Sequence, residues 1–467
     1  MNNSKKSIKT VAIIMVLMFV VAMAVIVKIA VYDSQSMIVN AYNPRINAAD
    51  STIKRGDIKD IDGYVYAYSQ KNDDVYQRQY NDAQSTSHVV GFVSVGKSGI
   101  EAKGNFTLQH ITEELKQRFK GFFFETDIEG DSIYLTVDKD LQDIASSIMR
   151  SNKGAVVVQE VSTGRILAMV SKPDFEPSTV YQNWEMIKDD ESSPLLNRAI
   201  SGKYTPGSVF KIVTAVSAVR NIDDINEFTF DCDGSFEIDG QSIKCYDGKA
   251  HGMQNFEEAF ANSCNGAFAQ LGLMLGGERL RTTAEDLLIN ENIEFLLGNS
   301  YSEVLLNTRS TENEVAETAM GQGRTTVSPL YMASLASAIA NDGIMMQPYI
   351  IDHTEDKNGN VINTTVPEKY AELFTKEECE KLTEMMVEVV NNGTGYNANS
   401  EYFQVAGKTG TAENAGGSDH LWFVGFAPAE NPQYAVSVVL ENNDGSANAS
   451  VVARKMLYNA IYREDLN

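Results

Sequence analysis

The stretch YTPGSVFKIVTAVSAV, residues 204–219, is the part of the sequence around which the fold can be worked out. Pro206 and Gly207 interrupt the preceding structure, and the small and apolar residues after them predict a buried helix that begins at Ser208. Because residues three apart lie on one face of a helix, the amine of Lys211 is expected beside the Ser208 hydroxyl. A lysine kept neutral by burial or by a nearby cation can take the proton of a serine, so the pair could form a nucleophile and its base.

Alone, this pair is weak evidence for an active site. Ser-x-x-Lys occurs by chance in many chains, and a serine that caps a helix, followed by a surface lysine, gives the same pattern. The rest of the chain has to decide between these interpretations.

Length and charge limit the possible functions. The chain has 467 residues, enough for about two or three domains with buried cores. Asp and Glu number 63 against 39 Lys and Arg, which gives a net charge of -24. This charge argues against nucleic acid or an anionic membrane surface as a partner.

The cysteines, Cys232, Cys245, Cys264 and Cys379, are too few for a disulfide scaffold. There is no Cys-x-x-Cys pair and there are only five histidines, so the sequence predicts no zinc site, and we expect no metal or cofactor. Cys232 and Cys245 flank a glycine-containing turn and could form a disulfide bond if the domain is exported; free thiols are the alternative. Cys264 is expected to be a small buried residue and not a nucleophile.

Residues 11–32 predict a transmembrane anchor. They contain an almost unbroken apolar run, and lysines precede it within residues 1–10. About 20 apolar residues in a helix span a bilayer, and the positive flank places residues 1–10 in the cytoplasm and the remaining chain outside. A cleaved signal peptide is the alternative, but the apolar run continues beyond the cleavage-like residues 22–24.

The remaining chain divides into two parts. Residues 33–130 are polar with short apolar runs, and Asp62-Gly63 reads as a hairpin turn, so they predict a β-rich N-terminal pedestal. Residues 131–467 have strand patterns near both ends, with a closing helix at about 449–462, and residues 196–340 between the strands are mostly helical in pattern. This order predicts an α+β domain in which one antiparallel sheet, built from both ends of the domain, is flanked by helices.

Two further motifs follow the first. Ser263-Cys264-Asn265 is expected on a loop between helices, and Lys408-Thr409-Gly410-Thr411 on a strand whose glycines let another backbone approach closely. Each is common alone. Ser-x-x-Lys, a Ser-x-Asn type triplet and Lys-Thr-Gly, in this order, are the recognised signature of serine β-lactamases and penicillin-binding proteins.

The sequence as a whole resembles the class B penicillin-binding proteins, the membrane-anchored peptidoglycan D,D-transpeptidases, and especially their shorter members. The resemblance covers nearly all of the chain after the anchor. Besides the three motifs, it includes residues 55–60, 154–171, 197–199, 321–323, 328–330 and 422–428.

The resemblance implies a serine acyl-enzyme mechanism. Ser208 would attack the penultimate D-alanine of a stem peptide ending in D-Ala-D-Ala, with Lys211 taking its proton and the terminal D-alanine leaving. Ser263 would relay a proton to the leaving amine, and Asn265 would hold Lys211 and the substrate amide. An amine from a second stem peptide would then complete the cross-link.

The third motif would bind the substrate. Lys408 would attract the substrate carboxylate and, as a second cation, favour neutral Lys211. The hydroxyls of Thr409 and Thr411 would bind that carboxylate, and Gly410 lies between them. The backbone N–H groups of Ser208 and Thr411 would form the oxyanion hole.

The resemblance also implies covalent inhibition by β-lactam antibiotics, a single-pass location in the bacterial cell membrane with the catalytic domain outside, and a polytopic glycan polymerase as membrane partner. A D,D-carboxypeptidase, a β-lactamase or β-lactam sensor, and a non-catalytic scaffold of wall synthesis remain alternatives. Glu303, in a Glu-x-x-Leu-Asn pattern found in class A β-lactamases, is the residue that favours hydrolysis. We expect His251 and His420 to be structural.

Overall fold

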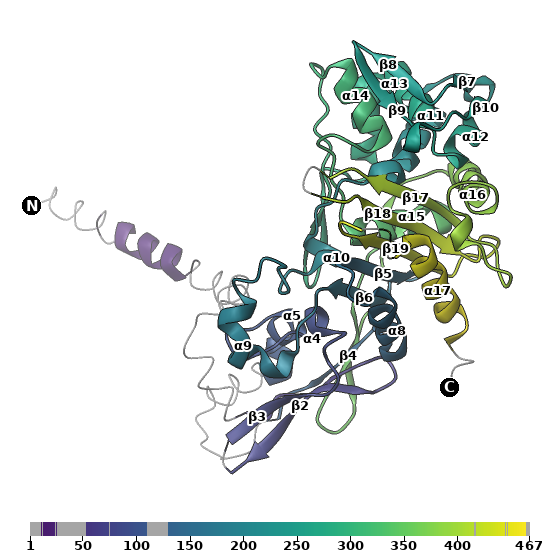
Figure 1. Cartoon of the computed structure of the whole chain (residues 1–467). Coiled ribbons are helices and arrows are strands. Elements are labelled where there is room, and N and C mark those ends of the chain that lie inside the picture. Colours follow the sequence, from purple (N-terminus) through teal and green to yellow (C-terminus); the bar gives the residue numbers. More distant parts are fainter. Residues whose placement is uncertain are drawn as a thin grey trace, which may run out of the picture.

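The computed structural model of the protein describes residues 11, 13–23, 25, 53–73, 75–109, 129–414, 417–443, 445 and 447–463. A five-stranded sheet of order β17-β18-β19-β5-β6 forms the centre of the larger part of the molecule (Figure 1). Its strands are β5 (Gly154–Glu160), β6 (Ile166–Lys172), β17 (Ala406–Ala412), β18 (His420–Ala427) and β19 (Tyr434–Leu440). All four pairings are antiparallel, which confirms the predicted sheet assembled from both ends of the domain.

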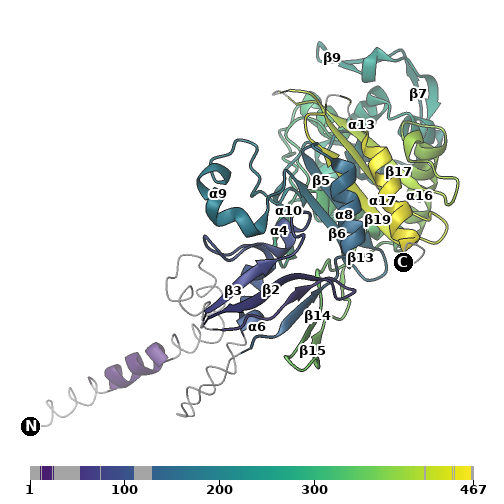
Figure 2. The ribbon, with the colours of Figure 1, turned by 60° about the horizontal axis from the view of Figure 1, so that its bottom comes forward.

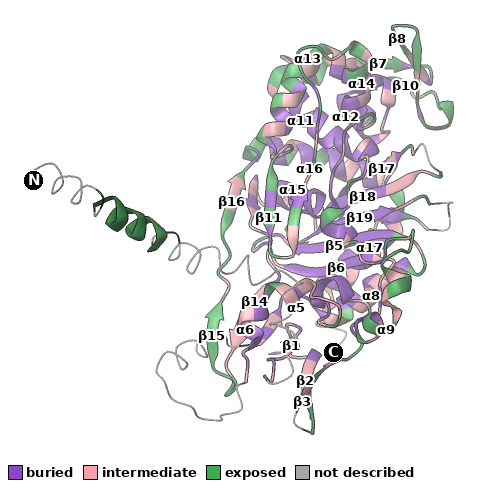
Figure 3. Cartoon of the chain, turned by 90° about the vertical axis from the view of Figure 1, so that its left-hand side faces the viewer, coloured by how far each residue is buried: buried purple, intermediate pink, exposed green. Residues whose placement is uncertain are grey.

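Helices cover both faces of this sheet. On one face, α8 (Lys139–Met149) and α17 (Ala449–Ile461) share a hydrophobic cluster with alternate residues of the strands, such as Val156 and Val158. On the other face, α15 (Pro329–Ala340) is buried from its first residue to Ile339, as its alanine-rich sequence predicts. The strands are therefore covered on both sides, which explains their nearly continuous apolar sequences (Figure 3).

A helical lobe lies beyond the β17 edge of the sheet (Figure 1). Its helices are α11 (Lys211–Asn221), α12 (Phe256–Ala261), α13 (Asn265–Asp286), α14 (Glu312–Met320) and α16 (Lys376–Asn391). The lobe also carries two-stranded ribbons. These are formed by β7 (Thr229–Cys232) with β10 (Gly252–Asn255) and by β8 (Ser235–Ile238) with β9 (Gln241–Lys244). A further ribbon, β11 (Asn292–Phe295) with β12 (Gly298–Tyr301), lies beside α10 (Arg198–Ser201) and α15. Residues 196–340 are thus less helical than predicted, because short strands of a few residues leave little periodic signal.

The pedestal is built on a second sheet, of six strands in the order β15-β14-β4-β1-β2-β3. These strands are β1 (Ile58–Lys59), β2 (Val65–Asn72), β3 (Val75–Tyr80), β4 (Ser132–Leu135), β14 (Ile351–Glu355) and β15 (Val361–Thr364). Three of them come from after residue 130, where the sequence suggested a domain boundary, and β14 and β15 reach the sheet from far along the chain (Figure 2). The pedestal and the larger domain therefore share a sheet.

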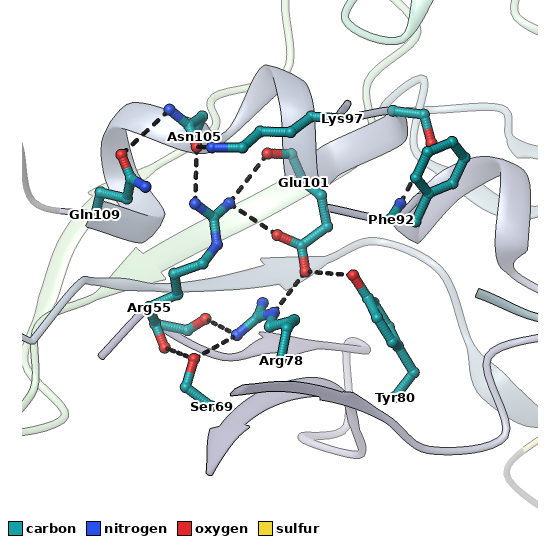
Figure 4. Close-up of polar contacts among 11 residues, drawn as sticks. Arg55, Ser69, Arg78, Tyr80, Phe92, Lys97, Glu101, Asn105 and Gln109 are labelled. Atoms are coloured by element: carbon teal, nitrogen blue, oxygen red, sulfur yellow. Dashed lines mark hydrogen bonds and ion pairs between the residues drawn. The ribbon is translucent and has the colours of Figure 1, made fainter. Parts of the chain in front are cut away.

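A buried ion cluster holds the pedestal together (Figure 4). Glu101 on α5 (Gly99–Lys103) is fully buried, and its carboxylate accepts from Arg55 Nη2 at 2.8 Å and from Arg78 Nε at 2.5 Å. Arg55 Nη1 also donates to Asn105 Oδ1 at 2.7 Å, on α6 (Asn105–Gln109). The two guanidinium groups compensate the buried carboxylate, so the cluster ties β3 and the two short helices to the start of the pedestal.

The predicted membrane anchor, residues 11–32, lies only partly within the residues that the structure describes. Residues 13–23 are helical, while residues 1–10 and 26–52 lie outside the described residues. Among the residues that are described, no helix has both the length and the apolar character that a membrane crossing requires.

Candidate active site

Ser208 lies in a short 3-10 helix, Gly207–Phe210, which leads directly into α11. The chain can enter this turn only through a glycine: Gly207 has φ 55°, and a Cβ there would meet the backbone oxygen of Thr411 at 2.4 Å. This close approach packs the turn against β17. The predicted helix is present, but its regular α-helical part begins at Lys211, one turn later than predicted.

Lys211 is the centre of the site. Its side chain is fully buried, and Nζ lies 3.2 Å from Ser208 Oγ, as the three-residue spacing predicts. Nζ also donates to the backbone oxygen of Ser263 at 2.7 Å and to Asn265 Oδ1 at 2.8 Å, and it lies 3.2 Å from Ser263 Oγ. The structure thus brings the first two motifs together on one amine.

Burial adjusts the chemistry of that amine. Removal from water lowers the pKa of Lys211 to about 7, so a large fraction of the amine is neutral near neutral pH and able to accept the Ser208 proton. The sequence offered two reasons for a neutral Lys211, its burial and the second cation Lys408. In the structure, burial is what lowers the pKa of Lys211.

Lys408 joins the third motif to the second. It is fully buried on β17, and its Nζ donates to Ser263 Oγ at 3.0 Å and to the backbone oxygen of Thr409 at 3.1 Å. Burial, and then the charge of Lys211, lower the pKa of Lys408 well below its usual value. Ser263 Oγ therefore lies between two amines, an arrangement suited to passing a proton between them.

Ser263 and Asn265 are held where α12 ends and α13 begins. Ser263 has φ 56°, a left-handed conformation that is rare outside glycine and asparagine and is often found at functional sites. Asn265 is the first residue of α13, and its Nδ2 donates to the backbone oxygen of Lys244 at 2.8 Å. The Asn265 amide, which we expected to bind the substrate, is thus engaged by the residue at the end of β9.

β17 forms the rim of the site. It is the terminal strand of its sheet, and Thr409 and Thr411 on it are half-buried. A Cβ at Gly410 would meet Pro206 O at 2.8 Å, so a glycine is needed where β17 passes the turn that carries Ser208. Thr409 Oγ1 lies 2.6 Å from Thr394 Oγ1. Thr394 and Lys244 carry no sequence signal that would have identified them.

Glu303 is placed apart from these contacts. Its backbone forms a bridge with Thr326, and no side-chain hydrogen bond among the described residues joins it to the three motifs. His420 is structural, as predicted: its Nδ1 accepts from Asn442 N at 3.1 Å, and its ring contacts Tyr204.

The chain matches two family models. Residues 154–463 match the penicillin binding protein transpeptidase domain, and residues 55–133 match the penicillin binding protein A dimerisation domain. Among curated proteins, it is 31% identical to the peptidoglycan D,D-transpeptidase PbpA of Mycolicibacterium smegmatis, over 95% of each chain.

Solved structures agree in fold. Penicillin-binding protein A from Mycobacterium tuberculosis, as its imipenem acyl-enzyme complex, superposes with a TM-score of 0.81 at 30% identity, covering 88% of this chain and 99% of that one. The D,D-transpeptidase domain of a peptidoglycan glycosyltransferase from Eggerthella lenta also gives 0.81, at 31% identity, covering 89% and 100%.

Proposed function

This chain belongs to the class B penicillin-binding proteins, and from that premise we propose how its site carries out peptidoglycan D,D-transpeptidation. The enzyme forms a serine acyl-enzyme and is acylated by β-lactams. One observation carries the assignment of roles: Lys211 Nζ contacts Ser208 Oγ, Ser263 Oγ and Asn265 Oδ1 at once, at 3.2, 3.2 and 2.8 Å. The nitrogen that we propose as the base is thus in contact with both the nucleophile and the relay hydroxyl.

Acylation begins at Ser208. Its Oγ attacks the carbonyl carbon of the penultimate D-alanine while Lys211 Nζ accepts the hydroxyl proton. The bond from that carbonyl to the terminal D-alanine nitrogen then breaks. Ser263 Oγ, in contact with both lysines, hands a proton to the departing amine.

The edge of β17 orients the substrate. A peptide lying along an edge strand can pair with its backbone. The hydroxyls of Thr411 and of Thr409, which is also hydrogen-bonded to Thr394, would bind the terminal carboxylate of the peptide. The backbone N–H groups of Ser208 and Thr411 stabilise the oxyanion. This oxyanion site is supported by the close packing of the turn that carries Ser208 against β17, which leaves no room for a Cβ at Gly207 or Gly410.

The acyl group then passes to an amine of a second stem peptide. That amine attacks the ester carbonyl and restores Ser208. Transfer is favoured over a carboxypeptidase reaction by the relatives, which are named transpeptidases. It is favoured over β-lactamase activity because, among the described residues, no side-chain hydrogen bond joins Glu303 to the three motifs.

We place the catalytic domain outside a bacterial cell membrane, on a single-pass anchor formed by residues 11–32. The apolar run there and the lysines before it support this location. A polytopic glycan polymerase is the partner we propose for the anchor and pedestal, because cross-linking acts on newly made glycan. Protease protection in spheroplasts tests the orientation: externally added protease should digest the catalytic domain.

The nucleophile is tested by mass spectrometry of the penicillin adduct. Incubation of the wild-type protein with benzylpenicillin should add one acyl group, located by peptide mapping on Ser208. Ser208→Ala should abolish the adduct while the exposed Ser201→Ala control keeps it. An adduct that persists in folded Ser208→Ala protein would refute the assignment.

A further inference from the structure

A groove lies between α17 and the segment that joins α16 to β17. One wall is formed by the 3-10 helix η6 (Tyr396–Ala398) and the chain that follows it to Tyr402, and the other by residues 454–459 of α17. The groove has a volume of about 450 Å³, which is within the range of sites for small ligands. Its residues take no part in the contacts that join the three motifs, so it is separate from the acylation site.

Tyrosine rings form a platform in this groove. Tyr402 packs edge-on against Tyr458, with ring centroids 5.2 Å apart, and Tyr458 in turn lies 5.0 Å from Tyr462. The Tyr402 ring is held by these neighbours, yet Tyr402 is 66% exposed. A ring that is already held in place and faces solvent can stack on a flat ligand with little further loss of side-chain entropy.

A second exposed ring belongs to η6. Tyr396 lines the groove and is also 66% exposed. The helix that carries it is anchored, because Ala398 is fully buried in the hydrophobic cluster that includes α17. Two large aromatic side chains therefore reach solvent from a rigid base, and an exposed aromatic patch with polar groups around it is typical of an interaction site.

Polar side chains surround these rings. Arg454, which is half-buried, and Lys455, which is exposed, supply N–H donors, and Glu401 supplies a carboxylate. The amides of Asn397 and Asn459 each provide both a donor and an acceptor. Sugar hydroxyl and N-acetyl groups require donors and acceptors side by side, and the groove provides both next to flat aromatic faces.

Charge argues against other classes of ligand. The whole chain has a net charge of -24, and the groove is lined by two cations and one carboxylate. A nucleic acid would require a more basic surface. A lipid chain would require apolar walls, whereas amides and charged groups form much of this lining. A neutral sugar, with C–H faces and polar edges, fits this combination of side chains.

We propose that this groove binds the glycan strand of peptidoglycan. The C–H faces of sugar rings stack on Tyr402 and Tyr396, and the hydroxyl and N-acetyl groups bond to the surrounding amides and cations. The inference rests on the proposed function, because peptidoglycan is the polymer on which a D,D-transpeptidase acts and its glycan is a chain of N-acetylated sugars. It adds a site for the part of the substrate that is not a peptide.

The groove is linked to the strand that orients the stem peptide. Thr394 Oγ1 lies 2.6 Å from Thr409 Oγ1 on β17, and Tyr396 follows Thr394 by two residues. The same segment continues past Tyr402 into β17 at Ala406. A glycan held in the groove would therefore raise the local concentration of its stem peptides near β17.

The two walls come from distant parts of the chain. Arg454 Nη1 donates to the backbone oxygen of Asn399 at 3.4 Å, across 55 residues of sequence. The contact between Tyr402 and Tyr458 joins the same two segments. Neither segment contains a recognisable motif, which explains why no sequence pattern indicated the groove.

Binding of a glycan without stem peptides tests the proposal. The probe is the tetrasaccharide of alternating N-acetylglucosamine and N-acetylmuramic acid, passed over captured full-length protein in surface plasmon resonance. The wild type should bind it saturably, and Tyr402→Ala should weaken binding about five- to tenfold, because a stacking face is lost. Tyr246→Ala is the matched control: Tyr246 is 71% exposed on η5 (Tyr246–Gly248), outside the groove, and its variant should bind like the wild type.

Lack of saturable binding by the wild-type protein would overturn the sugar site, and so would equal affinity in folded Tyr402→Ala protein. Thermal unfolding followed by circular dichroism checks the fold of the variant. Asn397→Ala, a change at a second exposed position of the groove, should also weaken binding and decides the question if Tyr402→Ala does not fold.

A second copy of this chain is the other occupant that the test must distinguish. Sedimentation velocity should give the same oligomeric state for the wild type and Tyr402→Ala; a wild-type dimer that the substitution converts to a monomer would overturn the sugar assignment. Ser208→Ala separates this inference from the proposed function. It should lose the penicillin adduct and still bind the tetrasaccharide, so either assignment can fail while the other stands.

Discussion

Lys408 Nζ donates a 3.0 Å hydrogen bond to Ser263 Oγ, joining residues 145 positions apart in the chain. The same hydroxyl lies 3.2 Å from Lys211 Nζ. One serine thus connects the lysine beside Ser208 to β17, the strand that we propose binds the substrate carboxylate. The catalytic assignments depend on this connection, and it suggests direct tests.

Ser263→Ala should slow acylation by about 100- to 10,000-fold, because it removes the hydroxyl that passes a proton to the leaving amine. The rate constant for acylation by a chromogenic cephalosporin measures the effect. A rate close to that of the wild type, in folded protein, would show that the proton takes another path.

Lys211→Met should reduce acylation by a similar factor of about 100 to 10,000, because the base is lost. Stability should be preserved, since a buried amine is replaced by an apolar side chain of similar length. The exposed Lys203→Met is the matched control and should react like the wild type. If Lys211→Met protein were still labelled efficiently by penicillin, another group would have to be the base.

The acylation rate should rise with pH through about 7 and then level off. Burial lowers the pKa of Lys211 to about 7, and the neutral amine that accepts the Ser208 proton exists above this value. Stopped-flow measurement of β-lactam acylation across the neutral range tests the sign. A rate that falls as pH rises through this range would mean that the protonated amine is the active form.

Glu303→Gln should leave the lifetime of the penicillin adduct unchanged. The Glu303 backbone pairs with Thr326, and no described hydrogen bond links its side chain to the motifs, so it is not placed as a base for a deacylating water. Mass spectrometry of the adduct over time measures the lifetime. A marked lengthening in the variant would identify Glu303 as a hydrolytic residue.

Glu101→Gln should destabilise the pedestal by about 3–5 kcal/mol, because it leaves two buried guanidinium groups without their carboxylate. The partly exposed Lys54–Glu129 pair provides a control: Glu129→Gln should cost about 1 kcal/mol or less. Urea unfolding followed by circular dichroism compares the variants. Equal effects of the two substitutions would show that burial of the cluster contributes little.

Much of the larger domain could be predicted from local patterns. The strands of the central sheet have short apolar runs, and α15 has a serine cap, a proline at its start and an alanine-rich sequence. The pedestal boundary could not be predicted in the same way. β4 and β14 belong to the pedestal sheet through pairing with distant strands, and pairing partners leave no mark in a local sequence window.

The sequence by itself determined that Ser208 and Lys211 lie together, because three residues along a helix return the chain to the same face. It also determined, through the order of three motifs, the family to which the chain belongs. Only the tertiary structure decided that Ser263 stands between two buried lysines, and that burial lowers the pKa of Lys211. The meeting of Cys232, Cys245, His251 and Cys264, whose sulfur and imidazole nitrogen atoms lie within 4.8 Å of one another, was likewise decided by packing, since contacts between distant segments depend on how helices and strands assemble and not on spacing along the chain.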